Sequence, residues 1–552
     1  MKRHAREEFY VLGEGILTQK NGEPACIRPS TAASLRKFRF SRLGPQGQPA
    51  TEGLITKLAK AMTADVQDPE SDVNGATPIP AGYTYLGQFL DHDLTMDATG
   101  VALGTDVSVD ELLQGRSPAL DLDSLYGRGP HSVDRIFYDS DGVSLKTGNT
   151  EPITFPDART NVPLDAYDLP RRAIGSTHKD RRQPLIPDQR NDENLAIAQT
   201  HSAFIRFHNT VVRDLASGGV SGDRLFTMAR DRVVRHYQWM VRTDFLPRVV
   251  DPATVQDVFT NGRKFFEVKP VPGDTPTMPI EFSVAAYRLG HSMVRDLYQW
   301  NRVFHRGGPG GTAPLFLLFV FTGLNGNFKP GTSVAELDDP NSGELDRLPT
   351  NWIADFRRLF DFSPVGNPAL LPPEGELNLA ERIDTLLVDP LAALPSGSFG
   401  GRGTGPIDPA ALQRNLAFRN LTRANMVKLA SGQQLAAQFG LESLKPDQLL
   451  TGNGGAVLTG LTPEEETELT TRTPLWFYVL REAELNGGVL TGVGGRIVAE
   501  VFHRAIEASR ISIVRDPFWR PTLGPNPGTF GMVELLRYAF DDRPELLNPL
   551  GE

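Results

Sequence analysis

Three polar residues, Gln88, Asp91 and His92, stand close together in a segment whose apolar residues keep a helical spacing. Residues three and four positions apart lie on the same side of an α-helix, so the spacing predicts that these side chains face one pocket. An imidazole that is neutral near pH 7 can both take up and return a proton. Taken alone, such a trio is more often a capped or solvated helix face, and the chemistry needs further residues.

Several residues with side-chain or carbonyl oxygens that can bind a metal ion follow Gln88, Asp91 and His92 in the sequence. Asp93 is adjacent to His92, and alternate positions of the later sequence SPALDLDSLYG add more candidates. Side-chain and carbonyl oxygens in this arrangement suit Ca²⁺, which takes about six to eight oxygen ligands. The loop lacks the glycine and the distal glutamate of an EF-hand, and a solvated acidic turn is the competing interpretation. The candidate calcium ligands are Asp93, Ser117, Ala119, Asp121 and Asp123.

A cation and a carboxylate occur together at the next polar cluster. Arg190 precedes Glu193 and Asn194 by three and four residues, at the start of a long apolar stripe that predicts a helix over 192–218. An intrahelical ion pair is the simpler explanation, and exposed pairs of this kind contribute only about 0.3 to 0.5 kcal/mol. The pair by itself does not require catalysis.

A histidine, His291, ends the sequence Ala-Tyr-Arg-Leu-Gly-His in a largely apolar segment. Gly290 beside it has no side chain, so a flat group can approach the backbone closely there. A lone histidine in such a segment is usually a hydrogen-bonded core residue. A haem iron, however, needs one neutral imidazole ligand with a hydrogen-bond acceptor behind it, and Asn420 is a candidate for that acceptor.

Length and composition exclude several classes of protein. The 552 residues are enough for a deep interior. Lys and Arg total 57 against 67 Asp and Glu, and the net charge of −10 repels a phosphate backbone, so we expect no nucleic-acid partner. The single cysteine, Cys26, excludes an intramolecular disulfide and a cysteine-based zinc cluster.

Membrane insertion is not expected either. The longest apolar run, residues 315–321, is far shorter than the roughly 20 residues that cross a bilayer. The first residues, Met-Lys-Arg-His-Ala-Arg-Glu-Glu, lack the apolar core of a signal peptide. We therefore expect a protein without a removable leader, either cytoplasmic or exported by a route that needs no leader.

The hydrophobic pattern predicts a mainly α fold with little β structure. We expect a loop-like N-terminal arm over residues 1–50 and one catalytic domain over 51–552, with a small β-ribbon near 137–146. Helical spacing recurs over residues 51–62, 83–95, 192–218, 224–245, 282–298, 352–360, 416–439, 473–485, 494–509 and 532–539.

Five sequence segments occur in one order along the chain: GQFLDHD, SPALDLDSLYG, RNDEN, YRLGH and RNLTR. In type and spacing they resemble the animal-type haem peroxidases of the peroxidase-cyclooxygenase superfamily, and their bacterial members most. The resemblance spans roughly residues 82–539. It implies a helical fold with haem buried between central helices, and an enzyme that reduces hydrogen peroxide through a ferryl intermediate and oxidises halides, pseudohalides or small phenols.

The resemblance also implies roles for individual residues. His92 corresponds to the distal base, Arg190 to its cationic partner and Gln88 to the distal amide. His291 corresponds to the proximal iron ligand with Asn420 behind it. Further correspondences are Asp91 and Glu193 as carboxylates that form ester links to haem, Arg288 and Arg423 as contacts of the haem propionates, and Asp93, Ser117, Ala119, Asp121 and Asp123 as calcium ligands.

The sequence departs from relatives at two informative positions. Asn194 stands where some mammalian members have a methionine that forms a sulfonium link to haem, so that link is not expected. Arg288 stands three residues before His291, where cyclooxygenase-like members carry a radical-forming tyrosine, and Tyr287 is one position out of register. Fatty-acid dioxygenation is therefore the alternative activity, and a non-catalytic adhesion module on the same fold is a third possibility.

Overall fold

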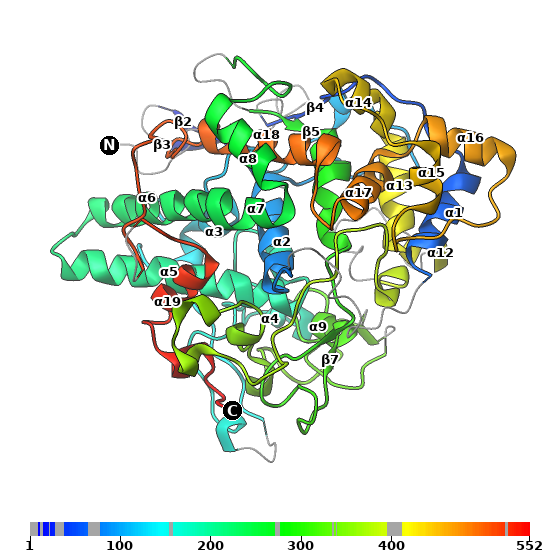
Figure 1. Cartoon of the computed structure of the whole chain (residues 1–552). Coiled ribbons are helices and arrows are strands. Elements are labelled where there is room, and N and C mark those ends of the chain that lie inside the picture. The colour runs from blue at the N-terminus through cyan, green and yellow to red at the C-terminus, as the bar shows by residue number, and fades with distance from the viewer. Residues whose placement is uncertain are drawn as a thin grey trace.

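The computed structural model describes residues 9–11, 15–20, 23–27, 38–64, 78–153, 158–270, 276–333, 336–337, 339–394, 411–524 and 528–552. In these residues the fold is mainly α-helical, as the sequence predicts (Figure 1). No described helix combines the length and apolar character needed to span a bilayer.

The helices form most of the structure around a continuous apolar core. They are α1 (Glu52–Met62), α2 (Gly82–Leu94), α3 (Asp123–Tyr126), α4 (His178–Arg182), α5 (Leu195–Ser217), α6 (Asp223–Met240), α7 (Leu246–Val249), α8 (Pro252–Asn261), α9 (Leu315–Val320), α12 (Ala411–Arg414), α13 (Leu416–Met426), α14 (Gly432–Phe439), α15 (Pro446–Thr451), α16 (Pro463–Thr471), α17 (Leu475–Leu485), α18 (Gly492–Ala508), α19 (Met532–Ala539) and α20 (Pro544–Leu547).

The strands are short, and those of the two strand pairs contribute side chains to the core. β1 (Phe9–Val11), β2 (Gly15–Lys20) and β3 (Glu23–Ile27) form an antiparallel sheet in that order. The expectation of a loop-like arm is therefore wrong for these residues, whose strands pair through backbone hydrogen bonds that a search for helical periodicity does not detect. The other strands form two pairs: β4 (Phe40–Ser41) with β5 (Met278–Pro279), and β6 (Leu297–Tyr298) with β7 (Ala313–Pro314).

Helix α2 lies at the centre of the molecule, between the long α5 and α6 pair and the group that contains α13 and α17 (Figure 1). It packs against α5 and against the turn that ends at His291. Its Leu86, Phe89 and Leu90 are fully buried, and Phe89 stacks on Phe204 of α5 with ring centroids 4.4 Å apart. Burial on several sides fixes the direction in which the polar side chains of α2 point.

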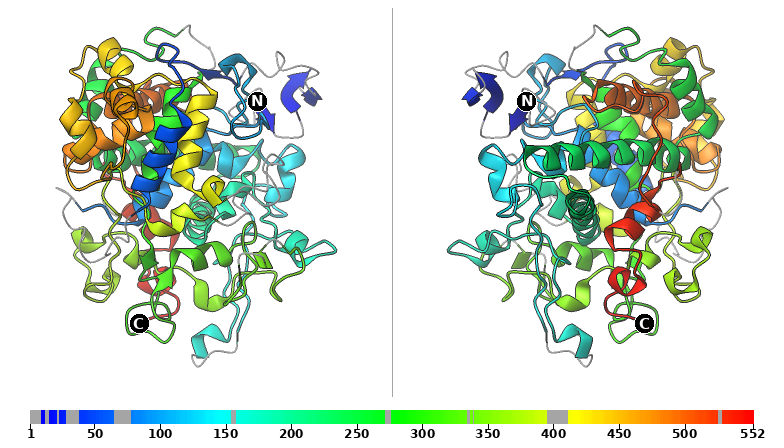
Figure 2. Two further views of the ribbon diagram at one scale, coloured as in Figure 1. Left: turned by 90° about the vertical axis from the view of Figure 1, so that its right-hand side faces the viewer. Right: turned by 90° about the vertical axis from the view of Figure 1, so that its left-hand side faces the viewer.

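The remaining helices brace this centre. α5 and α6 run side by side, and α1 packs along α13 (Figure 2). The end of the expected arm is hydrogen-bonded to the helical core: the backbone N–H groups of Leu43 and Gly44 donate to Glu281, and Arg42 donates to the Lys428 carbonyl at 2.8 Å. Residues 38–50 are thus attached to the surface of the main body.

Three predicted helices differ from the structure. The one expected over 282–298 is a π-helical turn (Glu281–Ala285) followed by a 3₁₀ turn (Ala286–His291), after which the chain enters β6. The one expected over 352–360 is a pair of 3₁₀ turns. The one expected over 416–439 is two helices, α13 and α14, because Lys428 adopts a left-handed conformation with φ of 48° between them.

The β-ribbon expected near 137–146 is reduced to one bridge between Tyr138 and Leu145. In each of these segments apolar side chains continue to face the core, so the hydrophobic pattern persists where the backbone is no longer regular.

Candidate functional site

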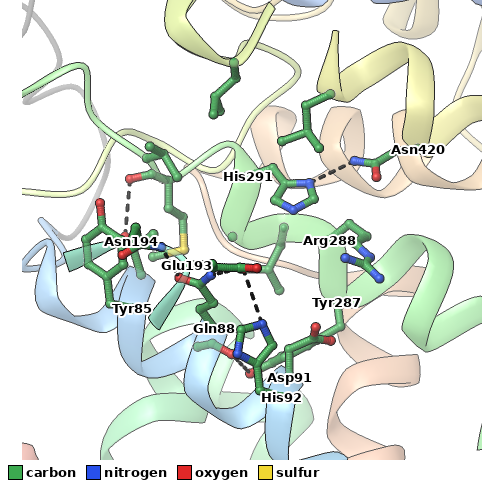
Figure 3. Close-up of a pocket in the computed structure, with 18 of the residues that line it drawn as sticks. Tyr85, Gln88, Asp91, His92, Glu193, Asn194, Tyr287, Arg288, His291 and Asn420 are labelled. Carbon is green, nitrogen blue, oxygen red and sulfur yellow. Dashed lines mark hydrogen bonds and ion pairs between the residues drawn. The ribbon is translucent and has the colours of Figure 1, made fainter. Parts of the chain in front are cut away.

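An internal cavity of about 220 Å³ lies between α2, the beginning of α5 and the 3₁₀ turn that ends at His291. Figure 3 shows His92 and His291 on opposite sides of this space. The sequence-predicted residues that line the cavity are Gln88, Asp91, His92, Glu193, Arg288, His291, Asn420 and Arg423. Segments far apart in the sequence therefore place one set of acid, base and cationic groups around a single space.

The tautomer of His92 is set by a buried chain of hydrogen bonds. Nδ1 of His92 lies 2.8 Å from Oδ1 of Asn191, and Nδ2 of Asn191 lies 2.8 Å from Nδ1 of His201. Burial lowers the pKa of His201 to about 3, so its ring is neutral and accepts from the amide. Because an amide oxygen only accepts, Nδ1 of His92 carries a proton, which leaves Nε2 as the nitrogen that can exchange a proton with a molecule in the cavity.

Gln88 is held between two neighbours that also line the cavity. Its Nε2 donates to Glu193 at 2.6 Å, and its Oε1 accepts from Asn194 at 2.9 Å. Asn194 is also the N-cap of α5, because its Oδ1 accepts from the backbone N–H of Ile197. Asn194 thus links the beginning of α5 to the face of α2 that carries Gln88.

The two predicted ester-forming carboxylates both reach the cavity. Asp91 accepts a hydrogen bond from the Thr95 hydroxyl at 3.1 Å. Oε1 of Glu193 lies 3.5 Å from Nε2 of His92. A dashed line marks this contact in Figure 3. One carboxylate comes from α2 and the other from the residue pair before α5, so they approach the cavity from different elements.

Arg190 lies behind His92 and is not among the residues that line the cavity. Its guanidinium donates to Asp188 and to the His92 carbonyl, and Arg116 contacts the same carboxylate at 2.8 Å. Burial alone would raise the pKa of Asp188, but the two guanidinium groups hold it well below its usual value. Two cations around one carboxylate leave one net positive charge beside His92.

On the opposite side, His291 ends its 3₁₀ turn with its ring toward the cavity (Figure 3). Burial, together with the positive charges of Arg288 and Arg423, lowers the pKa of His291 to about 3. The imidazole is therefore neutral at physiological pH. Nδ2 of Asn420 lies 2.8 Å from Nδ1 of His291, so the amide holds the ring from behind.

Three arginines, Arg288, Arg419 and Arg423, line the cavity near His291. Nε of Arg288 donates to the Ser283 carbonyl at 2.8 Å, which fixes that side chain within the irregular turn. Arg419 is one helical turn before Arg423 on α13, so the two share a face of that helix. Such a group can bind anionic substituents of a cofactor.

The predicted calcium residues are close to the C-terminal end of α2. The Asp93 carboxylate is buried and accepts from the backbone N–H groups of Leu122 and Ser124, each at 3.1 Å. Burial and the neighbouring Asp121 carboxylate raise the pKa of Asp93 to about 6. Across the part of the chain that the structure describes, no group of three or more His, Cys, Asp or Glu side chains is arranged to hold a metal ion. Calcium binding stays a prediction.

Sequence reasoning did not identify several residues of this site: Arg116, Asp188, Asn191, His201 and Arg419. Asn191 adjoins Arg190 in the RNDEN segment and Asp188 precedes it by two residues, so proximity in the sequence was an available signal. For Arg116 and His201 no local pattern distinguishes the residue. Their partners come from other segments, at hydrogen-bond distances of 2.8 Å in both cases.

Residues 99–310 match the family model described as animal haem peroxidase. The chain is 33% identical over 134 residues to a peroxidase-like protein of Margaritifera margaritifera, covering 22% of this chain and 15% of that protein. It is 26% identical over 148 residues to myeloperoxidase of Mus musculus, covering 26% and 20% of the two chains. The aligned regions thus span a fifth or less of the length of these relatives.

Solved structures agree with the fold. Peroxidase A of Dictyostelium discoideum superposes with a TM-score of 0.52 at 14% identity, over 86% of this chain and 88% of that one. A fatty acid α-dioxygenase of Oryza sativa superposes with a TM-score of 0.50 at 12% identity, over 86% and 76%. At these identities the likeness shows the fold. The family match over residues 99–310 and the curated relatives support an animal-type haem peroxidase.

Proposed function

We propose that this protein is a haem-dependent peroxidase that reduces hydrogen peroxide and oxidises halides, pseudohalides or small phenolic donors. The observation that carries the proposal is a pair of imidazoles, the buried His92 and the half-buried His291, that face one cavity from opposite sides. One ring presents a basic nitrogen fixed by Asn191, and the other is held neutral by burial.

The residues around the cavity fit a haem group. A Cβ placed at Gly290 meets no atom within 4 Å, so the backbone beside His291 leaves room for a flat ring. The neutral His291 is a suitable iron ligand, and the arginines on its side of the cavity complement two propionates. When bound, the haem would supply the iron that coordinates peroxide and stores the oxidising equivalents.

His92 is the proposed proton shuttle. Nε2 of His92 has the lone pair needed to take a proton from one peroxide oxygen, and the resulting imidazolium can return it to the oxygen that leaves as water. The amide oxygen of Asn191 keeps the ring in the required orientation during both transfers. Gln88, fixed by Glu193 and Asn194, supplies a second polar group to the cavity.

Arg190 acts from behind this base. Its contact with the His92 carbonyl fixes the end of α2, and the net charge of the Arg116, Asp188 and Arg190 cluster favours developing negative charge in the cavity. This role differs from direct contact with peroxide, because the guanidinium is held by Asp188.

Asn420 is the proposed orienting group for His291. The nitrogen and oxygen of an amide can exchange places by a half-turn, and with Oδ1 in the position of Nδ2, 2.8 Å from Nδ1 of His291, the ring would carry its proton on Nδ1 and direct the Nε2 lone pair into the cavity. The hydrogen bond also increases the basicity of the imidazole, which favours higher oxidation states of a bound iron.

Asp91 and Glu193 are the proposed sites of ester links to the haem periphery. Both carboxylates line the cavity, one from each of two elements. The double variant Asp91→Val and Glu193→Val should release all its haem into an acidic organic solvent after peroxide treatment, whereas the unmodified protein should retain it. Complete extraction from the unmodified protein would refute the ester proposal.

The test of peroxidase function is the stopped-flow optical reaction of haem-loaded protein with hydrogen peroxide. Replacement His92→Ala should slow that reaction by about 10² to 10⁴-fold, the usual contribution of a positioned acid-base group, while haem stays bound. His178→Ala, at an ion pair with Asp346 outside the cavity, is the matched control and should react at the unmodified rate. An unchanged rate in His92→Ala contradicts the proposal.

Fatty-acid dioxygenation is the second candidate, favoured by one observation. Tyr287, although out of register in the sequence, lines the cavity, and its hydroxyl donates to the Gly87 carbonyl at 3.2 Å. A dioxygenase would consume oxygen with linoleate in the absence of added peroxide. Under the peroxidase proposal, no such oxygen uptake occurs at a rate comparable with peroxide turnover.

A further inference from the structure

Tyr83 separates the haem cavity from a second cavity at the protein surface. Its side chain is 2% exposed, in the first turn of α2, and it lines both spaces. The surface cavity has a volume of about 430 Å³ and lies between the beginning of α2, the segment around Asp244 and α19. A single aromatic residue therefore connects the proposed oxidising site with the outside of the molecule.

The Tyr83 hydroxyl has a proton acceptor in direct contact. It donates to Asp244, whose two carboxylate oxygens each lie 2.8 Å away. Asp244 is also paired with Arg248 at 2.9 Å, and the guanidinium of Arg248 lies 4.4 Å from the centre of the Tyr83 ring. Burial and the Asp244 charge raise the pKa of Tyr83 well above its usual value, so the phenol stays protonated at neutral pH.

The environments of the other cavity tyrosines differ. Tyr85 is hydrogen-bonded to the hydroxyl of Tyr298, and Tyr287 donates to the Gly87 carbonyl. Neither of these partners is a base that takes up a proton readily. Oxidation of a phenol releases a strongly acidic proton, so among these three tyrosines Tyr83 has the partner that such a step requires.

The surface cavity has features of a site for an aromatic donor. Its side chains include three carboxylates and two guanidinium groups, which gives one net negative charge, beside the apolar Pro364, Val365 and Val533. Such a surface suits a neutral or cationic aromatic molecule better than an anion. A donor bound in the surface cavity contacts Tyr83 without entering the haem cavity.

We propose that Tyr83 relays oxidising equivalents from the haem cavity to this surface cavity, where phenols or aromatic amines too large to enter the inner cavity are oxidised. The proposal rests on the proposed function, because the peroxide-oxidised haem is the oxidant. Tyr83 gives one electron to that oxidant and its phenolic proton to Asp244, which leaves a neutral tyrosyl radical.

The relay is then restored by the donor. A phenol in the surface cavity gives one electron to Tyr83, Asp244 returns the proton to the tyrosyl oxygen, and the proton of the phenol passes to water. Each electron thus converts one phenol into one phenoxyl radical, and Tyr83 and Asp244 return to their initial states.

The direct test is freeze-quench electron paramagnetic resonance of the haem-loaded protein after mixing with hydrogen peroxide. We expect a tyrosyl signal that narrows when the protein contains ring-deuterated tyrosine and that is absent from Tyr83→Phe. Tyr538→Phe is the matched control, because Tyr538 also donates to a carboxylate, that of Asp214, but lines neither cavity. The same signal should persist in this control.

The variant Asp244→Asn tests whether Asp244 takes up the proton of Tyr83 or only holds its hydroxyl in place. The asparagine keeps a side-chain oxygen for the Tyr83 hydroxyl but does not take up its proton. The signal should therefore be weaker, with a shifted g1 value, because the hydrogen bond to the tyrosyl oxygen has changed. A full-strength signal with an unchanged g1 value would contradict the role of Asp244.

Donor size provides an independent readout. The ratio of the oxidation rate of a phenol coupled to dextran to that of iodide should fall at least about tenfold in Tyr83→Phe, a barrier difference of roughly 1.4 kcal/mol. Val533→Trp, which narrows the surface cavity, should lower the same ratio. If neither variant changes the ratio, the surface cavity is not the oxidation site.

The optical spectrum distinguishes failure of the relay from failure of the proposed function. If peroxide changes the haem spectrum but the tyrosyl signal is the same in Tyr83→Phe as in the unmodified protein, the relay is refuted and the peroxidase proposal stands. If peroxide leaves the haem spectrum unchanged, the peroxidase proposal and the relay fail together.

Discussion

At the scale of single residues, the catalytic proposal depends on which nitrogen of His92 carries the proton. Asn191 decides this, because its Oδ1 accepts from Nδ1 of His92 while its Nδ2 donates to His201. The sequence identified the histidine but not its partner. Asn191 stands beside Arg190 in the RNDEN segment, but its contact with His92 forms only where α2 and the turn before α5 meet.

Replacement Asn191→Ala should slow the reaction of haem-loaded protein with peroxide by about 10 to 100-fold, less than His92→Ala, because the base remains but is poorly oriented. The haem spectrum should be unchanged. Stopped-flow absorbance measures both properties. Asn209→Ala, which removes an asparagine that bonds to Leu145, is the control. Equal rates for Asn191→Ala and the unmodified protein would show that Asn191 does not orient His92.

From the ion pairs of Asp188 we expect that its replacement lowers the free energy of unfolding, and that this effect depends on pH. Asp188→Asn leaves two buried guanidinium groups without their carboxylate and should lower the free energy of unfolding by about 3 to 5 kcal/mol at pH 7. Asp346→Asn, at a more exposed ion pair, should change it by about 1 kcal/mol or less. Denaturant unfolding at several pH values measures both.

The sign of the pH effect follows from the lowered pKa of Asp188. A carboxyl whose pKa is lower in the folded than in the unfolded state contributes its stabilisation above the unfolded value, about 3.9, and loses it as the pH falls toward the folded value. The difference between unmodified protein and Asp188→Asn should therefore be constant above about pH 5 and shrink below about pH 4. A difference that grows on acidification would contradict this assignment.

At the scale of elements, the sequence was sufficient where a regular helix is amphipathic or buried along its whole length. Helices α2, α5, α6, α17, α18 and α19 are found close to their predicted bounds. The sequence was insufficient to predict the helix type around His291. There the chain is apolar but forms a π turn and a 3₁₀ turn in succession. Periodicity averages over several turns and so misses a local change of helix type.

The predicted calcium ligands lie where the end of α2 contacts the loop 117–123. Asp93 holds this loop through Leu122 and Ser124, and its carboxylate is buried near that of Asp121. A cation would relieve their repulsion, although the buried Arg230 already places a positive charge near Asp121 and Asp123.

Added Ca²⁺ should therefore raise the unfolding temperature, with a stabilisation of about 2.7 kcal/mol at a concentration one hundred times the dissociation constant. Chelation should reverse the shift, and Asp121→Asn should reduce it. Differential scanning fluorimetry with Mg²⁺ as the control ion measures these changes. The absence of any Ca²⁺-dependent shift in the unmodified protein would mean that Arg230 and the backbone donors satisfy the loop without a metal.

At the scale of the whole molecule, the boundary between arm and catalytic domain can be tested. Residues 42–44 contact Glu281 and the backbone near residue 428. Removal of residues 1–37 should leave haem binding intact, whereas removal of residues 1–50 should lower the unfolding temperature by several degrees, since about 1 kcal/mol corresponds to 2 to 4 °C in large domains. Equal stabilities of the two truncated proteins would place the boundary elsewhere.

The mainly α fold and the resemblance to animal-type haem peroxidases could be predicted from five ordered sequence segments, and four of these segments carry residues that meet at one cavity. The charge balance of the site could not be predicted from the sequence. Asp188 stands two residues before Arg190, but Arg116 reaches the Asp188 carboxylate from a loop 72 residues earlier, whose course is set by long-range packing. The family match covers residues 99–310, so the assignment of Gln88, Asp91 and His92 rests on the sequence motif and on their positions in the cavity.

The central claim is that haem binds between His92 and His291 with His291 on the iron, and optical titration of the haem-free protein with haem tests it most directly. The unmodified protein and His92→Gly should each bind one haem with a sharp Soret band. His291→Gly should give a weak and altered band that added imidazole restores. A His291→Gly spectrum identical to that of the unmodified protein, or no haem binding by the unmodified protein, would contradict the claim.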